Sequence, residues 1–377
     1  MTGLQLQLDR EDFLANHWQQ KPLLIKNGVE GFKPPIDANE LAGLALEDDV
    51  ESRLVEFHSN NWQLHHGPFS EQDFQRPHPW TLLVQAVDLY IPEVAELLQL
   101  IDFIPQWRVD DIMISYAVDG GSVGPHYDNY DVFLLQGEGQ RTWKLGQLCD
   151  NRTPLLPNDD LRILNDFRSE AEYTLSAGDI LYVPPGVAHW GIAKGECMTY
   201  SIGFRAPRIN ELLSRNVDAV LEQIDVDSFY RDPKLSALNQ PGEIKPEAIL
   251  AARQQLLATL EGQLTNHWFG ELVTEPKYEL ESPAHDHAVA DLHAFVETSQ
   301  LLALLPTSRI AWQQNGDELA VYANGECLIH SQAVLPTLIH LCEYRALDSA
   351  FLGAALARAE CAILLEQLLE CACFELE

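Results

Sequence analysis

The stretch Gly120-Gly121-Ser122-Val123-Gly124-Pro125-His126-Tyr127-Asp128 places a histidine and an aspartate two positions apart. On a strand, side chains at i and i+2 point to the same face, so His126 and Asp128 can reach one ion. A second stretch, Gly178-Asp179-Ile180-Leu181-Tyr182-Val183-Pro184-Pro185-Gly186-Val187-Ala188-His189, adds another histidine 61 positions after Asp128. The two stretches together predict one metal site, formed by His126, Asp128 and His189.

The residue types at this site indicate which metal it would hold. Two imidazoles and one carboxylate occupy one face of an octahedral ion and leave three positions free, which is the ligand set of non-haem Fe(II) oxygenases. An isolated His-x-Asp occurs by chance, whereas its combination with the Gly-Asp and Pro-Pro-Gly-x-x-His stretch is specific. A protein that binds metal through these residues without oxidising a substrate is the main alternative.

Short segments rich in Val, Ile, Tyr and Phe surround the predicted ligands and are separated by glycine-rich turns. Many short strands of this kind indicate a β-barrel or jelly roll. We expect Gly137-Glu138-Gly139 to form a hairpin between two of them. Strands are predicted at 107–118, 132–136, 141–145, 171–175, 180–183 and 197–204.

The segments that precede the barrel are more varied. The sequence predicts a helix at 9–18, a strand at 23–25, a helix at 39–49 and a strand at 50–57. Residues 62–79 are polar and are expected to form a solvated loop. Residues 81–100 carry apolar positions with helical spacing, interrupted at Pro92.

After the barrel, the apolar spacing predicts helices at 209–224 and 247–264. Two helices cannot bury their apolar stripes alone, so they pack on the barrel or on a second copy of the chain; we expect a homodimer, with ordinary intrachain packing as the alternative. Strands at 318–323 and 326–330, joined by Asn324-Gly325, form a predicted hairpin among helices and resemble a winged helix. The expected domains are a catalytic barrel at 1–206, a helical dimerisation segment at 207–281 and a winged-helix-like domain at 282–377.

Charge and composition limit the possible partners. With 57 acidic and 24 basic residues, the formal net charge is −33. Such a surface repels nucleic acid and attracts basic proteins, although acidity is also common among soluble proteins. Residues 301–377, which carry the winged-helix-like pattern, have three arginines against ten acids, so direct nucleic-acid binding is not expected. Seven scattered cysteines, no signal peptide and no bilayer-length apolar run predict a cytoplasmic protein without membrane contact.

An iron oxygenase needs an electron source, and a 2-oxo acid supplies one while chelating two open metal positions. The far carboxylate of that acid then requires a fixed cation. Arg141 lies fifteen positions after His126, and its planar fork suits a carboxylate better than Lys144 would. A surface salt bridge is the alternative role for Arg141. Ser115 and Tyr116 are both candidate hydroxyl donors to the same acid, and the sequence leaves open which of them faces inward.

These motifs resemble the JmjC-type 2-oxoglutarate oxygenases of the cupin superfamily. The run from Gly124 to Gly139 with Arg141-x-Trp143-Lys144-Leu145, and the N-terminal Phe13-Leu14 followed by Trp18-Gln19-Gln20-Lys21-Pro22, look like the bacterial ribosomal oxygenases, arginine hydroxylases of a large-subunit ribosomal protein. The resemblance implies an α+β chain with a double-stranded β-helix, a helical dimerisation segment and a winged helix.

The resemblance also implies a chemistry. Fe(II) would sit on His126, Asp128 and His189, and 2-oxoglutarate on Arg141. With O2, the enzyme would hydroxylate an arginine side chain and release succinate and CO2. An entering guanidinium needs a nearby carboxylate, which Asp119 is placed to offer, or Asp119 caps the glycine turn. Demethylation, hydroxylation of another residue, and a non-catalytic acidic scaffold for basic proteins are the rival functions.

Overall fold

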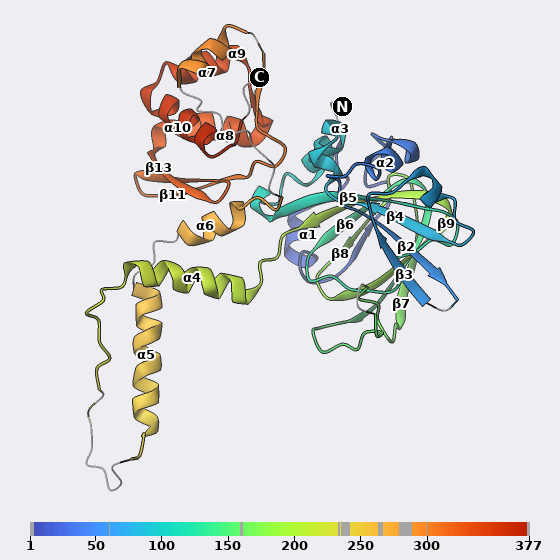
Figure 1. Cartoon of the computed structure of the whole chain (residues 1–377), viewed down its shortest axis with the longest axis horizontal. Coiled ribbons are helices and arrows are strands. Elements are labelled where there is room, and N and C mark those ends of the chain that lie inside the picture. The colour runs from blue at the N-terminus through green and yellow to red at the C-terminus, as the bar shows by residue number, and fades with distance from the viewer. Residues whose placement is uncertain are drawn as a thin grey trace. The chain divides into compact units, whose positions relative to one another are not determined.

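The structure is a computed structural model that describes residues 4–377 except 60, 159–160, 233, 235–241, 263–266, 279–288, 299 and 375–377. The chain divides into two compact units, Met1–Ala206 and Pro207–Glu377 (Figure 1). Each unit is described by itself. The predicted boundary between residues 281 and 282 lies outside the described residues and stays a prediction.

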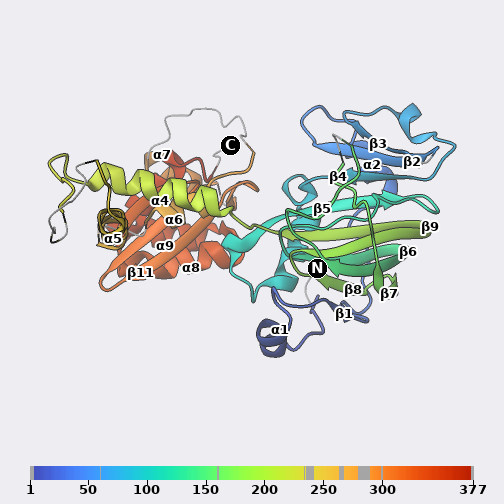
Figure 2. The ribbon, with the colours of Figure 1, turned by 90° about the horizontal axis from the view of Figure 1, so that it is seen from below.

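The first unit is built on one antiparallel sheet whose strands run in the order β1-β8-β6-β9-β5-β4-β2-β3, with β7 paired to β6. Figure 2 shows β5, β9, β6 and β8 side by side. The long strands β6 and β9 pair along most of their length at the centre of this sheet, which forms the predicted double-stranded β-helix. The strands are β1 (Leu23–Ile25), β2 (Ser52–His58), β3 (Asn61–His66), β4 (Trp80–Val84), β5 (Val109–Ala117), β6 (Val132–Leu148), β7 (Ser169–Ser176), β8 (Ile180–Val183) and β9 (Val187–Phe204).

Helices cover the outer face of this sheet. Phe13 of α1 is fully buried against Phe133 and Tyr182, with ring centroids 5.4 and 4.8 Å away. Asp37 begins α2 with a capping box that includes Glu40, which satisfies the first free backbone N–H groups. The helices are α1 (Arg10–Asn16), α2 (Ala38–Leu44) and α3 (Pro92–Ala95), with short 3-10 turns at Glu71–Phe74, Val87–Leu89, Glu96–Ile101 and Gln106–Arg108.

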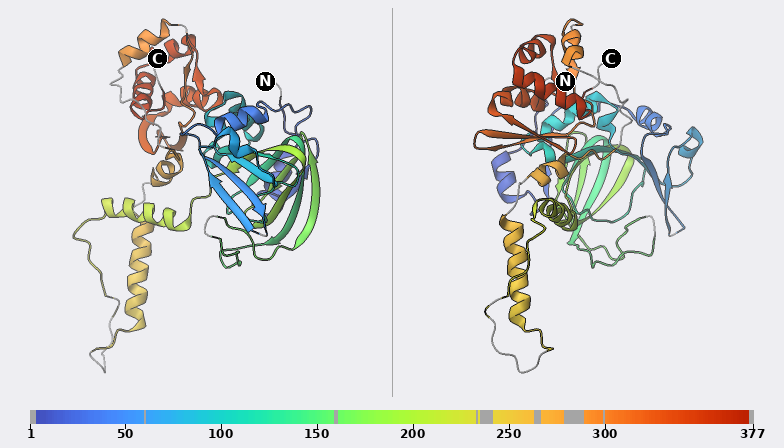
Figure 3. Two further views of the ribbon diagram at one scale, coloured as in Figure 1. Left: turned by 45° about the vertical axis from the view of Figure 1, so that its right-hand side comes forward. Right: turned by 60° about the vertical axis from the view of Figure 1, so that its left-hand side comes forward.

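The second unit contains helices around a three-stranded sheet, β11-β12-β13, as both views in Figure 3 show. The predicted Asn324-Gly325 hairpin is confirmed, with both residues at positive φ (48° and 91°). Its elements are α4 (Ile209–Gln223), α5 (Pro246–Gly262), α6 (His267–Thr274), α7 (Val289–Val296), β10 (Leu302–Ala303), β11 (Ile310–Asn315), β12 (Glu318–Ala323), β13 (Glu326–Ser331), a 3-10 turn at Gln332–Val334, α8 (Leu335–Tyr344), β14 (Ala346–Leu347), α9 (Ser349–Leu356) and α10 (Ala359–Glu370).

The apolar stripes of α4 and α5 remain exposed within this unit. Val220 is buried on α4, but Ile209, Leu213 and Leu221 are 78, 57 and 63% exposed. On α5, Ile249 and Leu256 are 65 and 66% exposed. By contrast, α6 packs on the small sheet, because Gly270 lets the helix approach the ring of Tyr322.

Three predictions about local structure were wrong. Residues 80–84 form strand β4 rather than the start of a helix, because their apolar run pairs with β2 and β5. Residues 61–66 form β3 and not a loop. Gly137-Glu138-Gly139 is not a hairpin turn, since β6 continues through it with register shifts against β9. Arg141 therefore lies in the middle of β6 and not at the start of a new strand.

Among the described residues, every helix is too short or too polar to cross a bilayer.

Candidate metal centre

His126 and His189 are brought together by their own backbones. The N–H of each donates to the carbonyl of the other, at 3.0 and 2.8 Å, which forms an isolated antiparallel bridge. The carbonyl of Asp128 accepts a hydrogen bond from the Gly186 N–H at 2.7 Å. Although we expected a strand at 126–128, only His126 has a bridge partner there and Asp128 lies in a loop. The glycine turns of the two stretches thus pair and place all three side chains together.

The three side chains form one cluster of candidate metal ligands. Their ligand atoms all lie within 4.8 Å of one another, and His189 Nε2 is 3.5 Å from Asp128 Oδ2. His189 is buried, whereas Asp128 and His126 are partly exposed. The prediction that these residues converge is met by the geometry, and two of the three side chains remain partly exposed.

Backbone carbonyls hold both imidazoles in the form that a metal requires. His126 Nδ1 lies 2.9 Å from the Gly124 carbonyl and His189 Nδ1 lies 3.0 Å from the Val187 carbonyl. With Nδ1–H donating, Nε2 carries the free lone pair. Burial, helped by the neighbouring His126, lowers the pKa of His189 to about 4. His189 is therefore neutral near pH 7, as a metal ligand must be.

A buried cation lies deeper in the same barrel. Arg141 is only 3% exposed, and its Nη1 donates to Ser115 Oγ at 3.4 Å. Its Nε and Nη2 have no hydrogen-bond partner among the described residues. A buried guanidinium is costly to leave unpaired, so the N–H groups of these two nitrogens suit a bound carboxylate. The alternative of a surface salt bridge does not fit such burial.

The structure separates the two candidate hydroxyl donors. Ser115 is buried and faces Arg141, whereas Tyr116 lies on the opposite face, where its ring is 5.7 Å from Trp80. Burial and a hydrogen bond to Glu196 raise the pKa of Tyr116 to about 12. Asp119 is exposed, and its Oδ1 accepts a hydrogen bond from the Gly195 N–H at 2.7 Å. That bond ties Asp119 to β9 and not to the glycine turn that it was expected to cap, and it engages one of the two carboxylate oxygens.

Comparison with known proteins identifies the family. A JmjC-domain model matches residues 96–212, and a model of the ROXA-like winged helix matches residues 253–372. The ribosomal protein uL16 3-hydroxylase of Escherichia coli is 38% identical over 85% of this chain and 86% of its own. The chain belongs to the bacterial ribosomal oxygenases of the JmjC type.

Two further relatives agree with this assignment. A probable ribosomal oxygenase of Haemophilus influenzae is 35% identical over 91% of this chain and 88% of its own. YcfD, a ribosomal oxygenase from Escherichia coli solved in complex with cobalt and 2-oxoglutarate, superimposes with a TM-score of 0.83 at 35% identity, covering 99% of both chains.

In this ribosomal oxygenase, sequence reasoning missed two residues beside the predicted cluster. Trp143 is 4% exposed, its ring centroid lies 5.9 Å from that of His189, and its Nε1 has no partner among the described residues. Tyr130 donates a hydrogen bond to Asp128, and the negative charge of Asp128 strongly raises the pKa of Tyr130, although Tyr130 is 41% exposed. The Arg-x-Trp spacing on a strand could have indicated Trp143, whereas no sequence pattern indicates the Tyr130 contact.

We expect Tyr130→Phe to weaken divalent metal binding about tenfold, because the phenol O–H fixes the orientation of the Asp128 carboxylate. Titration of the metal-free protein with Co(II), followed by calorimetry, measures this affinity. Tyr127→Phe is the matched control, since the Tyr127 hydroxyl donates to the Asp150 carbonyl at 2.7 Å and not to a ligand. Equal Co(II) affinities in the two variants would remove the role assigned to Tyr130.

Proposed function

We propose that this chain is an Fe(II)- and 2-oxoglutarate-dependent hydroxylase of an arginine in a basic large-subunit ribosomal protein. One observation carries the proposal: the same barrel holds a His-Asp-His cluster and a buried arginine whose Nε and Nη2 have no hydrogen-bond partner among the described residues. The first matches the Fe(II) ligand set, and the second matches a dicarboxylic cosubstrate.

Each residue then has a distinct task. His126, Asp128 and His189 would hold the iron, and Arg141 with Ser115 would bind the far carboxylate of 2-oxoglutarate. Bound iron and 2-oxoglutarate supply the oxidising chemistry with O2, leaving succinate and CO2. The protein positions these groups and excludes water, since His189, Arg141 and Ser115 are each at most 3% exposed.

The choice of substrate rests on charge and on the named relatives. The formal net charge of −33 favours association with a basic protein. The Escherichia coli relative is named for hydroxylation of ribosomal protein uL16, which makes uL16 the first substrate to test. An arginine entering the barrel requires a carboxylate partner, and Asp119 retains one oxygen beyond the one bonded to Gly195.

The same considerations bear on location and on nucleic acid. Seven free cysteines are compatible with a reducing cytoplasm, where we place the enzyme. The acidic winged helix gives no electrostatic attraction for phosphates, so we assign it a protein-contact or structural role without nucleic acid.

Mass spectrometry of the organism's ribosomal proteins tests the proposal. We expect uL16 to gain one oxygen atom on an arginine in cells that contain this chain, and to lack it when the chain is deleted or carries His126→Ala. His340→Ala, in α8 of the second unit, is the control and should leave the modification intact. Loss of a methyl group, or oxygen on another residue, would favour the rival enzymatic functions. No change on any protein would favour the non-catalytic scaffold.

Arg141→Met should raise the KM for 2-oxoglutarate about a hundredfold, because a buried charge pair is worth roughly 3 kcal/mol or more to the bound complex. Initial rates of succinate release at varied 2-oxoglutarate measure this. Lys144→Met is the matched control: it lies on the same strand, but its Nζ is 5.3 Å from the Trp190 ring, outside the site. If Lys144→Met raised the KM for 2-oxoglutarate strongly and Arg141→Met did not, Arg141 would not be the cation that binds the far carboxylate.

We also propose a homodimer formed through α4 and α5, because their apolar side chains are exposed in the single chain. Leu213→Asp combined with Leu256→Asp should convert a two-copy particle into a one-copy particle in sedimentation measurements. Leu148→Asp is the control, since Leu148 is 77% exposed but lies at the end of β6. A wild-type mass of one copy would contradict the dimer.

A further inference from the structure

The sheet register extends the inner face of the barrel onto the β2–β3 hairpin. Residues paired across an antiparallel sheet share a face. Ser115, which faces Arg141, pairs with Leu83, and Leu83 pairs with Arg53. The side chains of this hairpin on the Ser115 side, which we call the hairpin face, are Arg53, Val55, Phe57, Trp62, Leu64 and His66.

One end of the hairpin face carries an aromatic pair that borders the metal centre. The rings of Phe57 and Trp62 lie 4.7 Å apart, and Phe57 is 43% exposed. The Trp62 ring packs against Gly124, where a side-chain Cβ would lie 3.0 Å from it. Since Gly124 precedes His126 by two residues, the aromatic pair lies directly beside the loop that holds a candidate ligand.

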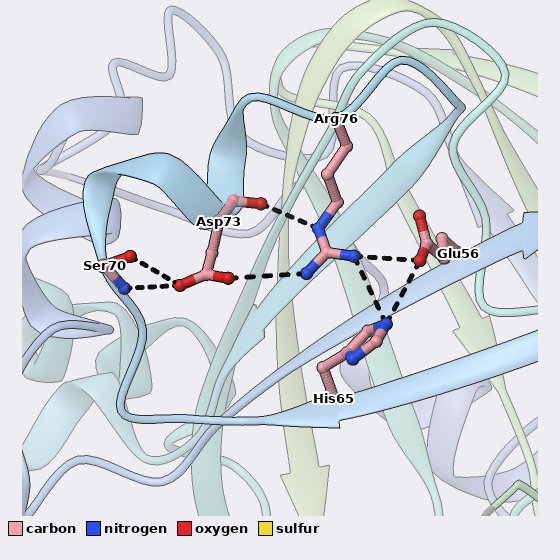
Figure 4. Close-up of polar contacts among 5 residues, drawn as sticks. All are labelled: Glu56, His65, Ser70, Asp73 and Arg76. Carbon is pink, nitrogen blue, oxygen red and sulfur yellow. Dashed lines mark hydrogen bonds and ion pairs between the residues drawn. The ribbon is translucent and has the colours of Figure 1, made fainter.

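The opposite side of the hairpin is fixed by an ionic network, shown in Figure 4. Arg76 Nη1 lies 2.9 Å from Glu56 Oε1, and His65 Nε2 lies 3.2 Å from the same oxygen. Arg76 Nε also donates to the Asp73 carbonyl at 2.8 Å, and the Asp73 carboxylate accepts from Ser70. Glu56, at the centre of the network, is 8% exposed, whereas the side chains of His65 and Asp73 are 38 and 41% exposed. The network holds the hairpin in place before any partner arrives, which lowers the entropy lost on binding.

We propose that the hairpin face is where the substrate protein docks, through a basic segment that flanks the oxidised arginine. The inference rests on the proposed function and specifies how that substrate is held. The face is continuous with the inner wall of the barrel, and its exposed end is aromatic. Aromatic ring faces attract Lys and Arg side chains, and the net charge of −33 draws a basic segment to the surface.

The basic residues of the hairpin face do not oppose this docking. Arg53 and His66 pair with each other at the end of the hairpin away from Phe57 and Trp62. Arg53 Nη2 donates to Gln85 Oε1 at 2.8 Å. A cationic segment that lies over the aromatic pair therefore does not contact Arg53 or His66 first.

Phe57→Ala tests the docking, with the organism's own uL16 as substrate. We expect the KM for uL16 to rise about tenfold, as for an aromatic residue at the centre of an interface. The kcat and the KM for 2-oxoglutarate should stay within about twofold of their wild-type values. Phe57 is neither a candidate metal ligand nor a residue assigned to 2-oxoglutarate. Trp312→Ala is the control: Trp312 is 40% exposed but lies on β11 of the second unit. Phe57→Leu keeps the apolar area and removes the ring, so it separates cation–π attraction from simple burial.

A binding measurement separates failure of the docking from failure of the proposed function. Fluorescently labelled uL16 is titrated with the full chain without 2-oxoglutarate, so that no turnover occurs. Tight binding that Phe57→Ala weakens about tenfold supports the docking even if uL16 is never oxidised. Wild-type affinity and KM in Phe57→Ala, or no binding of uL16 to the wild-type chain, would overturn it.

Discussion

The metal centre depends on one backbone interaction, the pair of hydrogen bonds between His126 and His189. These residues lie 63 positions apart, and their mutual N–H to C=O bonds bring the two glycine-rich stretches into register. The Gly186 N–H then holds the Asp128 carbonyl. Gly186 has a φ of +79°, and a Cβ there would lie 2.9 Å from the Cys149 carbonyl. Because the main chain sets the geometry, the three side chains start from fixed positions, as a site of precise geometry requires.

The sequence predicts the metal cluster, because metal binding demands particular residue types. It does not predict secondary structure that is decided by pairing between distant strands. A metal needs His and Asp at set spacings, so the cluster could be predicted from two motifs. The helical spacing predicted for residues 81–100 includes most of the strand Trp80–Val84, because a short apolar run does not distinguish a helix from a strand. Pairing with β2 and β5 is what makes this run a strand. Gly137 and Gly139 look like turn residues, yet they serve bulges, since Gly139 has a φ of +64° within β6. The choice between Ser115 and Tyr116 required the register of β5.

The surface of this protein is rich in negative charge, whereas the interior of the barrel contains a positive charge and hydrogen-bond donors. The surface is strongly acidic, with a formal net charge of −33. Among the described residues, the buried groups without a hydrogen-bond partner inside the barrel can all donate: Nε and Nη2 of Arg141, the indole N–H of Trp143 and the Thr81 hydroxyl. The acidic exterior suits a cationic protein, whereas the donor-lined interior suits a small dianion. Groups that attract cations and groups that attract anions therefore lie in different parts of the protein.

Because β6 runs without a break, it fixes the spacing between the buried Arg141 and the candidate ligand His189. On the β6–β9 pair, Leu145 lies opposite His189 and Arg141 lies opposite Ala193. The buried cation and one candidate ligand are therefore held by the same two strands, four residues apart. Had a hairpin separated them, their spacing would depend on a loop that can flex. Within a paired strand, a slip of one residue would turn Arg141 to the other face, so the register of β6 against β9 also fixes the face on which Arg141 lies.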